Sequence, residues 1–370
     1  MRKAHKTFSV PTMRRSSRIF INDLNTGKRD ELVGFLRLCH DTTQYFVDLF
    51  WQRKDFSATL ADLPTVHRGR DRFGITTRLA QALAKQAKET VRSAHANKHR
   101  KPSLRRHTAT LCSHFVTISE FDGAFDYAIK LIGSGAPRMV IPTKSTAHLN
   151  KMLGDGWKIG KSIRLGRRSD DLYVDLLLEK PRPPKNKTGK ILGMDSNYKA
   201  GLVFSDGQQV ADEPYALIQQ FGRRRKHTRT YIKSVVGHAL KSLDLAGVQE
   251  LCIEDLKHVK RGTRGKFPRR FNRRLSHWLY AYTADLIERK CEEEGVRLRR
   301  KGPWKTSQFC RVCRKWDRRN RRGDKFKCVH CGHSEHADLN AAKNLELLGL
   351  AGVYGLRSLP SPLPVYAGSG

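Results

Sequence analysis

Two Cys-x-x-Cys pairs near the end of the chain constrain its fold more than any other feature. Cys310 and Cys313 form the first pair, Cys328 and Cys331 form the second, and fourteen residues rich in Arg and Lys separate them. Four thiolates at this spacing can surround one tetrahedral metal ion, which is typical of a structural zinc site. The coordination sphere is then complete and leaves no open position for catalysis. We therefore predict a ribbon that holds one structural Zn²⁺ ion.

The four cysteines have one alternative use, which is to form disulfides. Disulfides persist in oxidising compartments, and the sequence shows no signal peptide for delivery to one. His330, His333 and His336 could replace a cysteine as a ligand, but four thiolates already suffice. The remaining cysteines stand singly in apolar surroundings, as core residues do. They are Cys39, Cys112, Cys252 and Cys291.

The net charge indicates the class of partner. The 370 residues include 72 Lys and Arg against 35 Asp and Glu, a formal charge of +37. Such a charge opposes compaction and favours a polyanionic partner. A membrane surface is one candidate, but there is no apolar run of about 18 residues and no evident lipidation motif. We therefore expect that the protein is intracellular, that its partner is a nucleic acid and that it does not associate with membranes.

Three acidic residues stand where the chain changes from one secondary structure to another. Asp195 ends the short apolar strand that begins at Ile191, Glu254 ends a second apolar strand, and Asp338 begins a helix. Strand ends and helix starts meet at one edge of an α/β sheet. Three carboxylates there can bind two divalent ions for phosphodiester hydrolysis. Carboxylate oxygens suit Mg²⁺ or Mn²⁺ better than zinc.

Each acid also has a simpler interpretation. Asp338 could be the N-cap of its helix, a position that Asp favours. Asp195 could begin a turn. Glu254 could be a surface residue paired with a lysine, and Asp255 beside it is a rival ligand. Taken together in so basic a chain, the three acids favour a nuclease.

Several motifs now form a recognisable combination. They are the strand ending in Asp195, Cys-Ile-Glu254-Asp-Leu, Thr306-Ser-Gln-x-Cys-x-x-Cys, Cys-x-x-Cys-Gly332 and Ala-Asp338-Leu-Asn-Ala-Ala-Lys-Asn. Together they resemble TnpB, a family of transposon-encoded RNA-guided nucleases related to the type V CRISPR effectors. The resemblance is specific over roughly 190–350 and looser over 1–180. The sequence departs from the family after Asp195. Members of the family often have a small hydrophobic residue and Gly there, whereas this chain has Ser-Asn.

The resemblance implies a multidomain α+β and α/β fold. An N-terminal wedge β-barrel with an inserted helical recognition lobe would precede a RuvC-type, RNase H-like α/β nuclease domain, which a four-cysteine zinc ribbon interrupts. In chain order the expected parts are the first wedge strands 1–27, the helical lobe 28–104, the rest of the barrel 105–180, a linker 181–190, the nuclease domain 191–301, the zinc-ribbon insert for target nucleic acid 302–335, the end of the nuclease domain 336–350 and a disordered tail 351–370.

The resemblance also implies the activity. Asp195, Glu254 and Asp338 would form a single RuvC-type site with two Mg²⁺ or Mn²⁺ ions. A guide RNA would direct cleavage of target DNA next to a short adjacent motif, with base pairing reading the sequence. A monomer acting at the nucleoid, in the cytoplasm of a prokaryote, is expected.

Basic residues would contact the nucleic acid, and aromatic residues would stack on its bases. Trp304, Phe309 and Trp316 are the stacking candidates, although packing within the ribbon explains them equally well. The basic candidates are Arg223, Arg224, Arg225, Lys260, Arg261, Arg264, Lys266, Arg269, Arg270, Arg273, Arg274, Arg318 and Arg319.

Three other functions stay open at this point. The protein could be a guided DNA-binding repressor that does not cleave, although such a protein need not keep all three acids. It could be an ordinary transposase that joins DNA strands. It could also be a miniature type V CRISPR effector, for which the chain is short.

Overall fold

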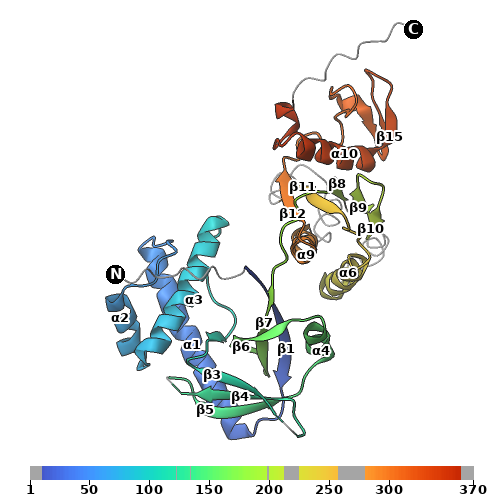
Figure 1. Ribbon diagram of the computed structural model, residues 1–370. Helices are drawn as coiled ribbons and strands as arrows, with labels where there is room; N and C mark the ends of the chain where they lie inside the picture. Colours follow the sequence, from blue (N-terminus) through green and yellow to red (C-terminus); the bar gives the residue numbers. More distant parts are fainter. Residues whose placement is uncertain are drawn as a thin grey trace, which may run out of the picture. The chain divides into compact units, whose positions relative to one another are not determined.

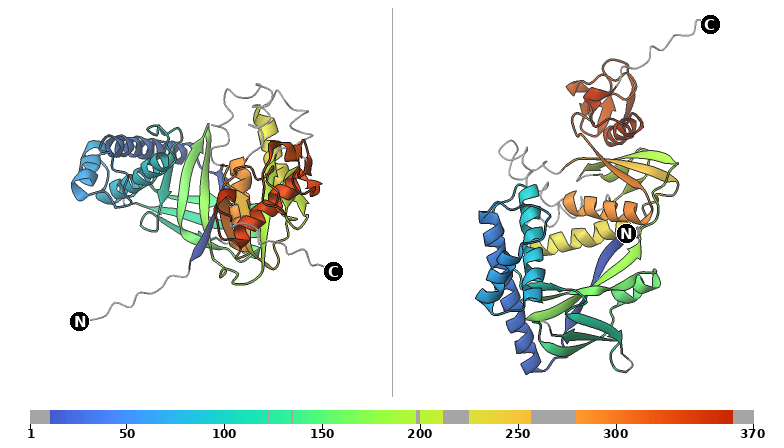
Figure 2. Two further views of the ribbon diagram at one scale, coloured as in Figure 1. Left: turned by 90° about the horizontal axis from the view of Figure 1, so that it is seen from above. Right: turned by 60° about the vertical axis from the view of Figure 1, so that its left-hand side comes forward.

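A computed structural model describes residues 11–121, 123–133, 135–197, 200–211, 225–256 and 280–359. The chain divides into two compact units, residues 1–181 and residues 182–370 (Figures 1 and 2). Among the described helices, none is both long enough and apolar enough to cross a membrane.

The helices of the first unit begin at polar caps and pack through apolar faces. They are α1 (Thr26–Gln52), α2 (Leu63–Phe73) and α3 (Thr77–Ala96), which lie side by side in Figure 2. Asn25, Asp62 and Thr76 each accept a hydrogen bond from a backbone N–H of the helix that follows, as N-cap side chains do. Gly74 ends α2 with a φ of 61°, which only glycine adopts readily.

The strands of the first unit form two antiparallel sheets. One has the order β1-β7-β6-β2 and the other the order β3-β4-β5. The N-terminal strand β1 therefore pairs with a strand from the end of the unit. Closure of these sheets into a barrel is not confirmed within the described residues. The elements are β1 (Thr12–Ile21), β2 (Thr108–Leu111), β3 (Val116–Glu120), β4 (Tyr127–Ile132), β5 (Arg138–Thr143), α4 (Ala147–Gly154), β6 (Lys158–Arg168) and β7 (Asp171–Pro181).

The second unit is built on a mixed sheet with the order β10-β9-β8-β11-β12. The strands β8, β11 and β12 run parallel, whereas β9 and β10 are antiparallel. Helices α6 and α9 lie side by side, as Figure 2 shows. The elements are β8 (Lys190–Asn197), β9 (Gly201–Phe204), β10 (Gln209–Val210), α6 (Arg225–Ala239), β11 (Val248–Glu254), α9 (Tyr280–Glu293), β12 (Arg297–Lys301) and α10 (Ala337–Leu350).

Alternate residues of the central strands face two different cores. Leu192 and Met194 pack with Ile287 and the other apolar residues of α6 and α9. Ile191 and Cys252 instead pack with Leu345 of α10. Side chains along a strand alternate between its two faces. The helix α10 therefore covers the opposite face of the sheet from α6 and α9.

The ribbon between β12 and α10 carries its own small sheet of β13 (Arg321–Arg322), β14 (Lys325–Lys327) and β15 (Ser334–His336). The start of the expected disordered tail differs from the prediction. Leu356, in a short 3-10 helix (Leu356–Ser358), is buried, and Tyr354 O accepts a 2.7 Å hydrogen bond from Gly302 N. Leu356 packs with Phe309 and Leu345, so the structure continues to residue 359 despite the Gly-rich composition. The rest of the tail lies outside the described residues.

Candidate active site and zinc site

The sheet register brings Asp195 and Glu254 to neighbouring positions. Gly193 pairs with Cys252 and Met194 pairs with Ile253 across the parallel strands β8 and β11. Asp195 and Glu254 are the next residues of each strand, and paired strands lie about 4.8 Å apart. The strand β8 extends to Asn197, so that Asp195 lies within the strand and not at its end.

Glycine allows α10 to pack directly on this face of the sheet. A Cβ atom on Gly193 would lie 1.8 Å from the carbonyl oxygen of Ala342, and one on Gly349 would lie 2.6 Å from Cys252 Sγ. The same Cβ atom on Gly349 would lie 2.7 Å from Ile191 Cγ2. The helix therefore runs against the direction of β8.

This direction places the first turn of α10 at the acidic end of the sheet. Asp338 lies one turn before Ala342, on the side of Asp195. Asp195 is two residues after Gly193 on β8, and Glu254 is two residues after Cys252 on β11. Residues two apart on a strand point to the same face, so both acids face α10. The three predicted acids thus share one face, although they lie more than 50 residues apart in sequence.

Asp338 is buried, with 2% of its surface exposed, and its partner is a cation from the ribbon. Arg321 Nη2 lies 3.2 Å from Asp338 Oδ1. The interpretation of Asp338 as the N-cap is wrong, because His336 occupies that position and its Nδ1 accepts from Asp338 N at 3.3 Å. Asp338 is therefore held inside the first turn with its carboxylate beside a positive charge.

Glu254 receives a hydrogen bond from the hydroxyl of Thr306. Burial raises the pKa of the Glu254 carboxyl to about 7, although the Thr306 hydrogen bond and the Arg321 charge both oppose this increase. Asp255, the rival ligand, follows the end of β11 and donates its backbone N–H to Lys301 O. Because residues two apart on a strand face the same side, Glu254 shares with Cys252 the face of α10, whereas Asp255 lies beyond the strand.

The four predicted zinc ligands come together. Cys310 Sγ lies 3.6 Å from Cys331 Sγ, and Cys313 Sγ lies 3.5 Å from Cys328 Sγ. All four sulfurs are within 4.8 Å of one another. A tetrahedral Zn²⁺ with bonds of about 2.3 Å requires sulfurs about 3.8 Å apart. The cluster therefore fits a zinc ion.

The sulfur cluster needs no histidine ligand. His333 Nε2 is instead 2.8 Å from Glu335 Oε1. Burial raises the pKa of the Cys310 and Cys313 thiols, whereas the backbone N–H of His333 helps to lower the pKa of Cys331 to about 7. Zinc binding would deprotonate all four thiols.

The carboxylates do not form a comparable cluster. Among the described residues, the four cysteines alone form a group of possible metal ligands whose donor atoms lie close together. Arg321 contacts one of the three acids and Thr306 contacts another. Two of the three carboxylates thus have side-chain partners from the segment before α10. Their oxygens are nevertheless the donors that Mg²⁺ and Mn²⁺ prefer.

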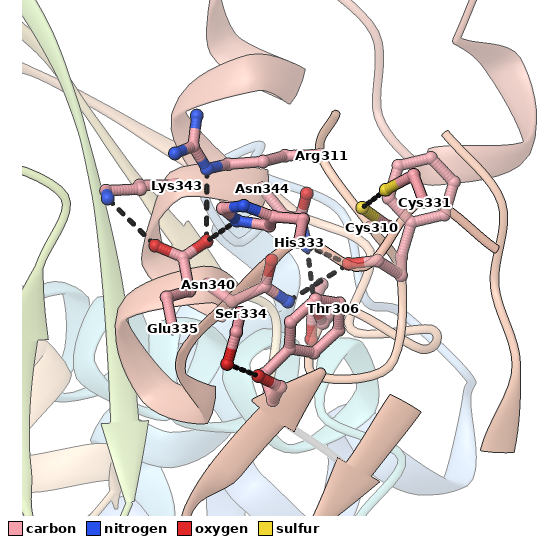
Figure 3. Close-up of polar contacts among 12 residues, drawn as sticks. Thr306, Cys310, Arg311, Cys331, His333, Ser334, Glu335, Asn340, Lys343 and Asn344 are labelled. Carbon is pink, nitrogen blue, oxygen red and sulfur yellow. Dashed lines mark hydrogen bonds and ion pairs between the residues drawn. The ribbon is translucent and has the colours of Figure 1, made fainter. Parts of the chain in front are cut away.

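Hydrogen bonds and ion pairs join the ribbon to α10 (Figure 3). Glu335 lies within 3.0 Å of Arg311, His333 and Lys343, which belong to the first knuckle, the second knuckle and α10. Asn340 Nδ2 donates to Phe309 O at 3.0 Å. The ribbon and the helix that carries Asp338 are therefore one connected structure.

The aromatic candidates differ in their surroundings. Phe309 is buried and packs with the α10 core, as the packing interpretation expects. Trp316 is 46% exposed, and Lys305 Nζ lies 4.8 Å from its ring centroid. Trp304 packs edge-on against Trp316 with the ring centroids 5.7 Å apart. Trp316 therefore remains a candidate for base stacking.

Few of the basic candidates can be located. Arg318 is exposed, and Arg319 is exposed but paired with Asp317 at 2.8 Å. Arg225 begins α6. The other candidates lie outside the described residues: Arg223, Arg224, Lys260, Arg261, Arg264, Lys266, Arg269, Arg270, Arg273 and Arg274.

Sequence reasoning missed two residues of the site. Arg321 is one of many basic residues in its segment, and nothing in the local pattern distinguishes it. Thr306 belongs to a motif that carried the family resemblance, but that motif did not reveal its contact with Glu254. Both contacts are made between distant segments and depend on the tertiary fold.

Comparisons with known proteins agree with this description. Residues 280–345 match the family described as "Cas12f1-like, TNB domain". The sequence resemblance to TnpB and its type V relatives is confirmed. The fold is similar to that of Cas12f1 in its complex with sgRNA and target DNA, with 15% identity, a TM-score of 0.53, and coverage of 86% of this chain and 82% of that one.

Two further structures show weaker similarity. A CRISPR-Cas12f ternary complex aligns at 16% identity and a TM-score of 0.30 over 88% of this chain and 85% of that one. CasPhi-2 (Cas12j) bound to crRNA aligns at 20% identity and a TM-score of 0.25 over 40% and 22% of the two chains. No curated protein matches this chain in sequence.

Proposed function

We propose that this protein is an RNA-guided DNA endonuclease with one RuvC-type site formed by Asp195, Glu254 and Asp338. The observation that supports this proposal best is that Asp195 on β8, Glu254 on β11 and Asp338 on α10 lie on the same side of the sheet. Two bound Mg²⁺ or Mn²⁺ ions would activate a water molecule and stabilise the leaving oxygen of a phosphodiester.

The protein's own residues orient these carboxylates and balance their charge. The site faces α10, whose packing limits the access of water to Asp338. Thr306 orients the Glu254 carboxylate, and Arg321 supplies a positive charge beside Asp338. Arg321 is then available to contact the negative charge of a phosphate group when cations occupy the carboxylates.

The nucleic-acid partners are supported by charge and by the Cas12f1 complex. That structure contains an sgRNA and target DNA, and we propose a guide RNA and target DNA for this chain. On its ribbon, Arg322, Lys325 and Lys327 are exposed on the face of β13 and β14 opposite the buried Phe326. Replacing all three with Gln should weaken binding and flatten its dependence on salt. An unchanged salt dependence would remove this face from the interface.

The first test is to express the gene with its native flanking DNA and to sequence the RNA that copurifies. A discrete RNA from the 3′ flank would provide a matching target for cleavage assays with Mg²⁺, in which the target-adjacent motif is varied. Asp195→Ala should abolish cleavage and keep binding, whereas Asp255→Ala should keep both. Equal cleavage by the wild type and Asp195→Ala would refute the assigned site.

A guided repressor without cleavage is the second candidate. The ion pair of Arg321 with Asp338 favours it, since this cation occupies one of the carboxylates. Tight binding of the guided target without cleavage in Mg²⁺ or Mn²⁺ would establish the repressor. A repeat-derived RNA would instead indicate a CRISPR effector, and the joining of DNA ends would indicate a transposase.

A further inference from the structure

Thr306 links β11 to α10 through buried polar contacts. Only 4% of its surface is exposed. Its hydroxyl donates to Glu254 Oε1 on β11, and its carbonyl accepts from Asn344 Nδ2 of α10 at 2.8 Å. A buried hydroxyl must find a partner, and here the partner is one of the three acids of the proposed site.

The segment that carries Thr306 is a tight turn leading into the first zinc knuckle. Lys305 adopts a φ of 59°, and its carbonyl accepts from Gln308 N at 2.9 Å and Phe309 N at 3.0 Å. Such left-handed backbone is uncommon for a residue other than glycine and persists only when its surroundings hold it. The turn ends at Cys310, the first zinc ligand.

Two asparagines hold this turn from α10. Asn340 Nδ2 and Asn344 Nδ2 donate to the same acceptor, Phe309 O, at 3.0 and 2.8 Å. Both side chains are fully buried. On the other side, Phe309 forms a β-bridge with Trp316, and Cys310 N donates to Lys315 O at 2.9 Å. The knuckle and α10 therefore fix the turn from opposite sides.

We propose that Thr306 is a positioning residue for Glu254, and that the zinc knuckle and Asn344 keep Thr306 in place. This inference rests on the proposed function, because it takes Glu254 as a ligand of a divalent cation. If the zinc knuckle holds Thr306 in place, zinc is required for the geometry of the carboxylate site as well as for the fold of the ribbon. Since such coupling is reciprocal for binding free energies, a cation at the carboxylates would also tighten the binding of zinc.

Mn²⁺ binding to the purified full chain with its copurified RNA tests this inference by electron paramagnetic resonance, without any cleavage. The difference in Mn²⁺ binding between the wild type and Asp195→Ala defines the carboxylate site. Mn²⁺ bound to the RNA is the same in both samples and therefore cancels. Thr306→Val, which keeps the shape and loses the hydroxyl, should weaken this binding about tenfold. Thr306→Ser should stay within about twofold of the wild type. The matched control Ser307→Ala, which removes the adjacent hydroxyl, should also leave the affinity unchanged.

Zinc content and thermal unfolding distinguish positioning from folding. Asn344 donates its hydrogen bonds to Thr306 O and Phe309 O, and not to Glu254 or a cysteine. Asn344→Ala should therefore weaken Mn²⁺ binding several-fold while one zinc per chain is retained. Equal affinities for the wild type and Thr306→Val would overturn the inference. So would a Thr306→Ser variant that folds and keeps zinc but binds as weakly as Thr306→Val, or a folded Asn344→Ala variant with unchanged affinity. Mn²⁺ binding that Asp195→Ala leaves unaffected would refute the proposed metal site, and Thr306 positioning with it.

Discussion

The guanidinium of Arg321 lies 3.2 Å from the carboxylate of Asp338, although the two residues belong to the ribbon and to α10. Asp338 is almost fully buried, and a buried carboxylate without a partner is strongly destabilising. Arg321 therefore neutralises Asp338 in the metal-free protein. A divalent cation would offer the same carboxylate a second, stronger positive charge, so the arginine and the cation compete for it.

Arg321→Gln should lower the stability of the metal-free protein by up to about 3 kcal/mol, because it leaves Asp338 buried beside a neutral amide. Added Mg²⁺ should restore part of this loss and should therefore stabilise the variant more than the wild type. Thermal unfolding with and without Mg²⁺ measures both effects. Arg322→Gln is the matched control, since its side chain is exposed on the other face of β13. A loss of the same size in the control would argue against the special role of Arg321.

The raised pKa of Glu254 predicts that cation binding depends on pH near neutrality. Burial raises this pKa to about 7, and a carboxylate must lose its proton to bind a cation. The affinity for Mn²⁺ should therefore fall about tenfold for each unit of pH below about 7. Titrations from pH 5.5 to 8.5 measure this dependence, and Glu254→Gln should remove it. The same slope in Glu254→Gln would assign the proton to another group.

The same raised pKa affects the stability of the metal-free protein in the opposite direction. An unfolded Glu has a pKa of about 4.3, so the folded state binds the proton more tightly. The stabilising contribution of this proton is complete below the unfolded pKa and is lost as the pH rises through about 7. Wild-type protein in a chelator of Mg²⁺ should therefore lose more stability between pH 5 and pH 8 than Glu254→Gln does.

Replacement of one zinc ligand should unfold the ribbon. Cys310→Ser removes one of the four clustered thiolates, and structural zinc contributes directly to folding. Zinc content should fall from one ion per chain towards zero, as elemental analysis would measure. Cys112→Ser is the matched control, because this half-buried cysteine lies in the first unit and should leave zinc unchanged. Full zinc in Cys310→Ser would contradict the four-cysteine site.

Local signals in the sequence were sufficient to predict the cluster of four cysteines and several elements. The spacing of Cys310 and Cys313 relative to the second pair is typical of a zinc site, and the four sulfurs do lie together. Leu79, Leu83 and Val91 recur at helical spacing in the sequence, and all three are buried in α3. These predictions depend on residues that are close in sequence, where backbone geometry leaves few alternatives.

Contacts between distant segments could not be predicted in the same way. The pairing of Arg321 with Asp338, rather than with another acid, depends on how β13 lies against α10. The contact of Thr306 with Glu254 depends on a turn that α10 holds through side-chain amides. The choice between Glu254 and Asp255 needed the register of β11 against β8. Neither charge nor spacing contains this information.

The close approach of α10 to β8 provides the sharpest test of the acidic site. Gly193→Ala would place a methyl group 1.8 Å from Ala342 O, and the helix would have to move by more than an ångström. We expect a loss of about 3 kcal/mol or more in stability, together with weaker Mn²⁺ binding, because Asp338 moves with the helix. Thermal unfolding and Mn²⁺ titration measure the two effects.

Gly237→Ala is the control for this substitution. It adds the same methyl group to α6, where its nearest neighbour is Tyr282 Oη at 3.5 Å, an ordinary contact distance. Alanine also favours helix over glycine by up to about 1 kcal/mol, so this variant should be as stable as the wild type or slightly more stable. If Gly193→Ala kept full Mn²⁺ affinity, α10 would not be what brings Asp338 to Asp195 and Glu254, and the site would have to be assigned to other residues.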